Sequence, residues 1–362
     1  MEGTLKTKIF IALASLLILA GPLFGYQEVL RVDKPLASEQ ELAALLKTAF
    51  DSASSELYFS VDESRPWFDE EVMDDEMSAV AWSSTSGGLF YADCSYSATS
   101  EEGSKLESIS LSIAYTFPRS SIASIVEETD RNAAAMVAAL VKPGMGDFAK
   151  ELALHDGLVQ AASYDAVAFS TGRDGPGTHT PYGVLCEGKG VCDSFSKAFL
   201  MLASKAGLEC RIVQGTAEEG SHSWNLVRID GSWYHLDVTY DDPVGPTKIL
   251  SHDYFNLPDG LIAANHSWKR DSVPACSSGE ANWFEVENLV VEDFRALEAS
   301  LETSFRNRDR GISRRLRSFS PATFGAELEK AIAAAESKVP FRGIDYTFNQ
   351  DIGTLSLDVQ YR

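Results

Sequence analysis

One hairpin signal near the middle of the chain constrains the fold more than any other feature. Two runs rich in aromatic and β-branched residues, 223–229 (SWNLVRI) and 232–239 (SWYHLDVT), are separated only by Asp230-Gly231. Asp-Gly is the dipeptide that a two-residue hairpin turn favours, because both positions of the turn need a positive φ angle. The pattern predicts an antiparallel hairpin with a fixed register.

In that register Trp224 faces Asp237 and His222 faces Thr239. Side chains alternate along a strand, so His222 and Asp237 share a face as diagonal neighbours, within reach of a His–Asp hydrogen bond. A register moved by one pair would put Asp237 opposite Leu226 and separate the two groups. A carboxylate in this position fixes the tautomer of an imidazole base and stabilises its protonated form.

A cysteine precedes this hairpin at the predicted start of a helix. Gly188-Lys189-Gly190 is a flexible run, and Gly207 stands where a C-cap glycine belongs. After Cys192, apolar residues recur at three- and four-residue spacing: Phe195, Ala198, Phe199, Leu202, Ala203 and Ala206. The unpaired N–H groups and the dipole of a helix N-terminus favour a thiolate near neutral pH. The backbone N–H of Cys192 is also placed to bind an oxyanion.

These residues resemble the transglutaminase-like superfamily, the papain-related fold with a Cys–His–Asp triad. The matching motifs are Gly190-Val191-Cys192, Lys197-Ala198-Phe199, His222-Ser223-Trp224-Asn225, Asp230 to Thr239 (DGSWYHLDVT) and Asp241-Asp242-Pro243. Weaker matches to the family flank these motifs at 155–158, 164–165, 254–255 and 266–268. The resemblance covers roughly residues 150–268, under half of the chain.

The resemblance implies an α+β, papain-like core in which a helix carrying the cysteine packs on an antiparallel sheet carrying His and Asp. It assigns the nucleophile to Cys192, the base to His222 and the orienting carboxylate to Asp237, and it implies no cofactor and no metal. Many relatives have a Gly-aromatic pair where this chain has Ser194-Phe195. No side chain can be assigned to the oxyanion hole.

Length and charge limit the number of domains and the kinds of partner that the chain can have. A chain of 362 residues is long enough for several domains. The formal net charge of −22 argues against nucleic acid and anionic membrane surfaces as partners. We expect a targeting segment at 1–25, an α+β accessory region at 26–118, the catalytic core at 119–270, a basic linker at 271–320 and an α+β accessory region at 321–362.

The first residues have the layout of a secretory signal. Lys6 and Lys8 precede the apolar run 9–20, which Gly21-Pro22 ends. The run is short for a membrane span, which needs about 20 residues. A cleaved signal and an uncleaved anchor both remain open, and either predicts an extracytoplasmic protein whose only membrane contact is this segment.

The five cysteines are an odd number, which leaves at least one thiol unpaired in an exported chain. That number suits one catalytic thiol plus up to four others, among which Cys210 is expected to be a core residue. A disulfide between Cys186 and Cys192 would switch the enzyme off. No CxxC pair occurs, which argues against a zinc site.

The flanking regions are expected to be mixed helix and strand. Helices are predicted at 39–50, 122–140, 146–162 and 324–337, and strands at 56–61, 89–97, 109–117, 254–257, 341–348 and 354–361. The helix 324–337 and the two strands after it are similar in order to the helix 41–52 and the strands 58–61 and 110–115 near the N-terminus, which suggests an internal repeat. The basic run 306–317 reads as a solvated linker, with docking on the acidic cluster 69–76 or on anionic wall polymer as alternatives.

Several other polar residues have a functional and a structural interpretation. His155 is expected to pack or hydrogen-bond on a helix face rather than act as a base. Asp241 and Asp242 are expected to cap a turn rather than bind metal. His235 is expected to be a half-exposed strand residue, and the loop 171–180 a connector, although it could border the substrate cleft.

Three functions from different classes follow. The first is an exported thiol enzyme that acts on amide bonds of a protein or peptide substrate, such as cell-surface or cell-wall peptide, through a thioester. Water would resolve the thioester in a peptidase or amidase, and a lysine amine would resolve it in a transglutaminase. The second is a catalytically inactive binding module, and the third is a structural envelope protein whose flanking modules carry the function.

Overall fold

The computed structural model describes residues 29–62, 68, 70–100, 106–218, 220–242 and 250–361. The chain divides into two compact units, with the boundary between Ser124 and Ile125. Both units combine helices with mostly antiparallel sheets, so the predicted α+β class is confirmed. The predicted targeting segment 1–25 lies outside the described residues.

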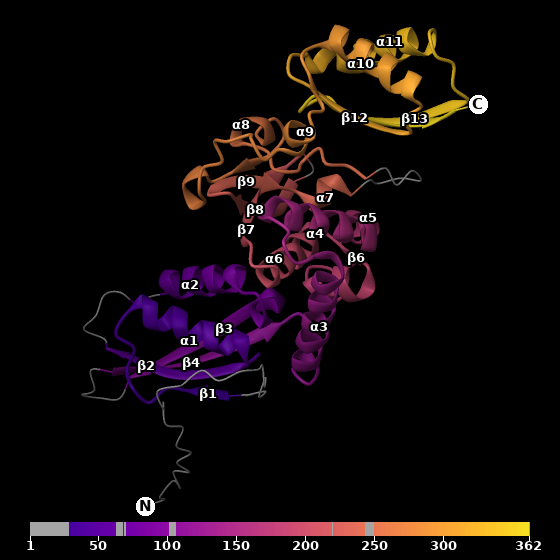
Figure 1. Cartoon of the computed structure of the whole chain (residues 1–362). Helices are drawn as coiled ribbons and strands as arrows, with labels where there is room; N and C mark the ends of the chain where they lie inside the picture. Colours follow the sequence, from indigo (N-terminus) through magenta and orange to yellow (C-terminus); the bar gives the residue numbers. More distant parts are fainter. Residues whose placement is uncertain are drawn as a thin grey trace, which may run out of the picture. The chain divides into compact units, whose positions relative to one another are not determined.

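The first unit is a four-stranded sheet with two helices on one face (Figure 1). Strand β1 runs parallel to β2, whereas β2 and β3 both run antiparallel to β4, which gives the order β1-β2-β4-β3. The elements are β1 (Val29–Arg31), α1 (Glu39–Asp51), β2 (Glu56–Asp62), α2 (Glu70–Ser83), a 3₁₀ turn η1 (Gly87–Phe90), β3 (Tyr91–Ser100) and β4 (Leu106–Tyr115).

Helix α1 shows why the sequence folds this way locally. The side chain of Ser38 caps its N-terminus by accepting a hydrogen bond from the backbone N–H of Glu41. The predicted apolar face, Leu42, Leu45, Leu46 and Phe50, is buried against the sheet. The helix predicted over 39–50 is therefore confirmed.

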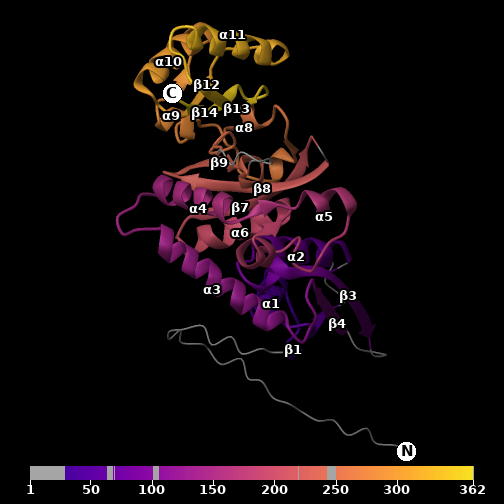
Figure 2. The ribbon, with the colours of Figure 1, turned by 90° about the vertical axis from the view of Figure 1, so that its right-hand side faces the viewer.

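Helix α3 (Ile122–Leu140) leads from the first unit into the second, which contains the predicted core. Helices α4 and α6 cover one side of a four-stranded antiparallel sheet of order β10-β7-β8-β9 (Figure 2). Its elements are α4 (Asp147–Ala161), β5 (Ser163–Tyr164), α5 (Ala166–Thr171), a π-helical turn η2 (Gly183–Glu187), β6 (Lys189–Gly190), α6 (Cys192–Lys205), β7 (Glu209–Ala217), β8 (Gly220–Ile229), β9 (Ser232–Leu236), α7 (Val238–Asp241), α8 (Asp259–Ile262), β10 (Ser267–Trp268) and α9 (Trp283–Val286).

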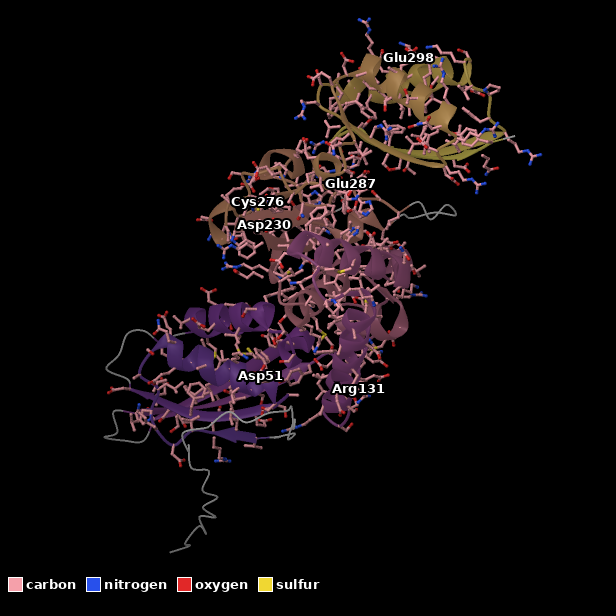
Figure 3. All side chains as sticks on the ribbon, in the orientation of Figure 1. Asp51, Arg131, Asp230, Cys276, Glu287 and Glu298 are labelled. Atoms are coloured by element: carbon pink, nitrogen blue, oxygen red, sulfur yellow. The ribbon has the colours of Figure 1, made fainter. Side chains whose placement is uncertain are left out.

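The second unit ends in a module with the topology of the first unit. Two helices pack on a sheet of order β11-β12-β14-β13, in which only the first pair is parallel. Glu298 of α10 points away from the sheet (Figure 3). The elements of this C-terminal module are β11 (Val290–Val291), α10 (Phe294–Asn307), β12 (Gly311–Leu316), α11 (Phe324–Glu336), β13 (Gly343–Asn349) and β14 (Thr354–Gln360).

The internal repeat is therefore present in the topology, but its predicted alignment was wrong by one helix. The counterpart of α1 is α10, not α11, although β4 and β14 correspond as expected. The boundary expected at residue 320 divides this module, because α10 and β12 precede it and supply part of its core.

The basic run 306–317 is accordingly not a linker. It spans the end of α10 and the whole of β12. Arg314 donates to the hydroxyl of Ser300, and Arg315 donates to Asn282 and Glu285. These arginines hold their own unit together, which explains a basic segment in an acidic chain.

Two predicted strands also differ from the structure. Strand β9 ends at Leu236 rather than Thr239, because the carboxylate of Asp237 caps a short helix, α7, that follows it. The segment 254–257 is buried but irregular, with one bridge between His235 and Leu257 in place of a strand. Within the described part of the chain, no helix is both long enough and apolar enough to cross a membrane.

Candidate active site

Cys192 is the first residue of α6. Val191 precedes it in extended conformation, with φ −99° and ψ −175°, and serves as the N-cap residue. The predicted apolar face of the helix, which includes Phe195, Phe199 and Leu202, is fully buried. The helix ends as expected, with Gly207 just beyond it at φ +77°. Helix geometry leaves the N–H of Cys192 without an intrahelical acceptor.

The hairpin that carries His222 has the predicted register. Ile229 pairs with Ser232 and Asn225 pairs with Leu236. The predicted register therefore holds through Leu236, the residue before Asp237. Asp230 and Gly231 both have positive φ angles, 49° and 88°, as the two-residue turn requires. The local sequence is therefore sufficient to place His222 and Asp237 near each other.

Asp237 is fully buried and has a hydrogen bond at each of its carboxylate oxygens. Its Oδ2 lies 2.6 Å from Nε2 of His222. Its Oδ1 accepts the backbone N–H groups of Thr239 and Tyr240 at 3.0 and 3.2 Å. The carboxylate is thus fixed by its own helix cap while it holds the imidazole, which leaves Nδ1 of His222 for the thiol of Cys192.

His222 and Asp237 each shift the pKa of the other so that both favour their charged forms. Burial acts to lower the pKa of His222, but the charge and hydrogen bond of Asp237 and the hydrogen bond of Cys192 raise that pKa to about 10. Burial acts to raise the pKa of Asp237, but His222 and His266 hold it well below its ordinary value. The arrangement therefore favours an imidazolium next to a carboxylate.

A second histidine, which the sequence motifs leave without a role, contacts the same carboxylate. Nε2 of His266 lies 3.0 Å from Oδ2 of Asp237, and its side chain is completely buried. His266 precedes β10, which pairs with β7. The only signal in the sequence was the weak family match at 266–268, because the contact is made across the sheet and not within a motif.

The rings of Trp224 and His222 are stacked, with centroids 5.8 Å apart. Trp224 is 1% exposed and so lies beneath the site rather than walling it. Trp233 instead lies beside Arg211, on another part of the sheet surface.

Two hollows meet at the thiol. One of about 340 Å³ is lined by Tyr164, Phe169, Cys192, Ala217, Glu218, Gly220, Ser221, His222, Thr239, Tyr240 and Asp242. The other, of about 460 Å³, is lined by Ala168, Phe169, Gly172, Asp174, His179, Val191, Cys192, Asp193, Gln214, Gly215, Ser221, His222 and Ser223. Cys192 and His222 line both, so a chain could extend to either side of the thiol. The loop 171–180 borders this cleft rather than only connecting elements.

The other polar residues considered as candidate site residues make hydrogen bonds that stabilise the fold. His155 is buried and contacts Asp156 and Asp241, as the packing interpretation predicts. Asp241 also accepts the backbone N–H of Tyr254, and Asp242 accepts that of Tyr164. These carboxylates tie distant segments together.

His235 is fully buried, so its predicted half-exposed position was wrong. It accepts a hydrogen bond from the indole of Trp224 and contacts Asp259. Burial lowers its pKa to about 4, although Asp259 acts in the opposite direction. His235 is therefore a neutral core residue on the strand that leads to Asp237.

All five cysteines are free. Cys186 contacts Thr129 and Asn132 of α3 through its sulfur. Three groups in the described residues bring possible metal-ligand atoms within 4.8 Å of one another: His155 with Asp156 and His252, His222 with Asp237 and His266, and His235 with Asp259 and Cys276. In all three, each histidine already has a hydrogen bond to the carboxylate.

Comparisons with known proteins give one family. Residues 134–238 match the family model of the transglutaminase-like superfamily. No curated protein matches the chain at a significant level. The family match covers α4, α6 and the hairpin, and it includes all three predicted site residues, Cys192, His222 and Asp237.

Solved structures align only in part. A TGase aligns over 55% of this chain and 56% of its own, with 13% identity and a TM-score of 0.30. A proposed cysteine protease from Cytophaga hutchinsonii aligns over 41% and 65%, with 14% identity and a TM-score of 0.25. A proposed protease from Parabacteroides distasonis aligns over 50% and 39%, with 11% identity and a TM-score of 0.25. The chain spans less than two thirds of the length of each of these structures.

Proposed function

Since residues 134–238 belong to the transglutaminase-like superfamily, we propose that the chain is a thiol enzyme that acts on amide bonds. Cys192 is the nucleophile, His222 the base and Asp237 the group that orients the base. The observation that carries the proposal is the 2.6 Å contact between Nε2 of His222 and Asp237, made beside a thiol at the start of a helix. Together these features supply nucleophile, base and orienter in one cleft.

The reaction divides into two steps. The thiolate of Cys192 attacks the amide carbonyl, and the protonated His222 gives its proton to the leaving amine as the C–N bond breaks. A thioester remains on Cys192. His222 then removes a proton from water or from an amine, which attacks the thioester and releases the thiol. The backbone N–H of Cys192 is placed to stabilise the negative oxygen in both steps.

The lining of the cleft supports a substrate with cationic groups or an amine acceptor. Glu218 and Asp242 line one hollow, and Asp174 and Asp193 line the other. No Lys or Arg lies among the described residues that form either hollow. A cleft lined by one sign of charge raises the local concentration of the opposite charge. A protein or peptide with exposed lysines, such as cell-surface or cell-wall peptide, fits this lining.

The predicted site of action is outside the cytoplasm. The proposal rests on the signal-like sequence of residues 1–25, with Lys6 and Lys8 before an apolar run. Fusing residues 1–30 to a reporter enzyme that is active only after export tests it. Export of the fusion, lost when the run 9–20 is interrupted by charged residues, is the expected result, and retention of the intact fusion in the cytoplasm contradicts it.

The activity is tested with two probes on the same protein. A fluorescent primary amine and a glutamine-containing protein such as dimethylated casein report acyl transfer, and quenched-fluorescent peptides report hydrolysis. Either signal, lost in Cys192→Ala and kept in Cys210→Ala, supports a thiol enzyme. If neither signal appears and a thiol-directed probe fails to label Cys192 in the reduced protein, the chain is an inactive binding or structural module.

A further inference from the structure

His266 lies between two hydrogen-bond acceptors. Its Nε2 is 3.0 Å from Oδ2 of Asp237, and its Nδ1 is 2.7 Å from Oδ1 of Asn265. Each ring nitrogen of His266 thus faces an oxygen of a neighbouring side chain, and the two contacts hold the ring in one orientation between Asp237 and Asn265.

The orientation of Asn265 is fixed from its other side. Its amide Nδ2 donates to the hydroxyl of Tyr254 at 2.6 Å and to Oδ2 of Asp351 at 3.3 Å. A carboxylate can only accept, so turning the amide over would set two acceptors against each other. Asp351 thus keeps Oδ1 of Asn265 directed at His266.

Asp351 belongs to the turn between β13 and β14 in the C-terminal module. Asn349, the last residue of β13 before this turn, donates from its amide to the hydroxyl of Tyr254 at 2.8 Å. Ile352, also in this turn, is buried in the hydrophobic cluster that contains Trp224 and Tyr254. The turn is therefore anchored in the core directly behind the catalytic hairpin.

We propose that His266 is a positioning residue of the thiol site, and that the β13–β14 turn holds its ring in place through Asn265. The inference rests on the function proposed above. It gives the C-terminal module a role, because the turn is linked to the thiol through Asp351, Asn265, His266, Asp237 and His222 in succession. The two imidazoles share Oδ2 of Asp237, so the position of one affects the other.

His266 also acts on the electrostatics of the site through Asp237. Burial acts to raise the pKa of Asp237, whereas His222 and the hydrogen bond and charge interaction of His266 lower it. The titratable groups that face or influence His266 are Asp237, His222, His235, Tyr240 and Tyr254. Without the imidazole of His266, more of the negative charge of Asp237 would act on His222 and Cys192, so the titrations of both should move to higher pH.

The test is the pH dependence of iodoacetamide alkylation of Cys192, which needs no substrate. In His266→Gln the side chain retains an N–H donor for Asp237 but lacks the imidazole. Both midpoints of the alkylation profile, for thiol deprotonation and for loss of the His222 proton, are expected to rise by roughly 1 unit. A purely structural role would leave the midpoints unchanged and affect only the thermal unfolding temperature.

A second variant tests the link to the C-terminal module. In Asp351→Ala the amide of Asn265 is free to turn its Nδ2 toward His266, so Nδ1 of His266 loses the oxygen that holds the ring against Asp237. The midpoints should again rise, whereas removing a negative charge by itself would lower them. Asp358→Ala is the matched control, because Asp358 is an exposed carboxylate on β14 of the same module.

The outcomes separate this inference from the proposed function. A wild-type thiol with an ordinary midpoint overturns the proposed function and this inference with it. A low wild-type midpoint that does not move in His266→Gln overturns the role of His266 alone. Equal profiles for Asp351→Ala and Asp358→Ala overturn the role of the β13–β14 turn.

Discussion

Nε2 of His222 and Oδ2 of Asp237 are 2.6 Å apart, and the carboxylate is completely buried. The backbone N–H groups of Thr239 and Tyr240 hold the other oxygen of Asp237, so the carboxylate cannot turn away from the imidazole. This relationship follows from the hairpin register and from the helix cap that ends β9.

Asp237→Asn should abolish most turnover without unfolding the protein. The amide keeps the shape of the side chain and one acceptor for the α7 cap, but it no longer stabilises the imidazolium or fixes its tautomer. By analogy with other triads, turnover in the amine-incorporation or peptide assay should fall roughly 10³- to 10⁴-fold.

The matched control for Asp237→Asn is Asp156→Asn. Asp156 also contacts two histidines, at 2.9 and 2.8 Å, but it lines neither hollow. This variant should change the thermal unfolding temperature more than the turnover. Full turnover in Asp237→Asn would show that the triad assignment is wrong.

Phe169→Ala should weaken substrate binding more than chemistry. Phe169 is 43% exposed on α5 and lines both hollows beside the thiol. A bound chain that covers this ring would remove apolar surface from water, an effect on the order of 1.5–3 kcal/mol for full burial. KM should rise about tenfold or more with kcat little changed. Val167→Ala is the control, since Val167 is 64% exposed on the same helix but lines neither hollow.

Gly215→Ala should separate β10 from β7. A Cβ at this position would collide with the backbone oxygen of Ser267 and lie 2.8 Å from the indole of Trp224. Overpacking of this kind costs about 1–3 kcal/mol in the free energy of unfolding. Because Ser267 follows His266, the alkylation profile of Cys192 should change as well. Gly311→Ala, where no atom lies within 4 Å of the added Cβ, should leave both measurements unchanged.

Glu151→Gln should make the protein more stable at pH 8 but not at pH 4.5. Burial raises the pKa of Glu151 to about 8 from an ordinary value of 4.5, although the hydrogen bond of Asn256 and the charge of His155 act in the opposite direction. The folded state holds this proton more tightly than the unfolded state, so stability falls as pH rises from about 4.5 to about 8.

Gln keeps the hydrogen-bonded shape without the charge, and the gain at pH 8 should be on the order of 3 kcal/mol. Urea unfolding at the two pH values measures it. Glu329→Gln, an exposed substitution on α11, is the control and should show no such difference. Equal stability of wild type and Glu151→Gln at pH 8 would contradict the buried-charge explanation.

The catalytic hairpin could be predicted because its determinants are local. Asp230-Gly231 sets the turn, the turn sets the register, and the register brings His222 and Asp237 to one face. The start of α6 at Cys192 is equally local, since a glycine-containing run precedes a regular apolar face. That run was expected to be flexible, but Lys189–Gly190 forms the short strand β6, which pairs with β5. Each of these features depends on residues that are close together in the sequence.

The contacts that the sequence did not reveal join segments far apart in the chain. His266 reaches Asp237 through the pairing of β10 with β7, and Asp351 reaches Asn265 from a different module. The sequence did not predict the end of β9 at Leu236, because Asp237 fits the alternating pattern of a strand. In the structure its carboxylate instead caps the helix α7. The repeat was misaligned because α10 and α11 are both amphipathic, and only the sheet pairing shows which one corresponds to α1.

The most direct test of the central claim is the pH profile of Cys192 alkylation by iodoacetamide in wild type and in His222→Ala. A thiolate–imidazolium pair predicts a wild-type midpoint well below the roughly 8.5 of a free thiol, and a clear rise when His222 is removed. An ordinary midpoint that is the same in both proteins would contradict the account, because Cys192 and His222 would then share a cleft without acting on each other.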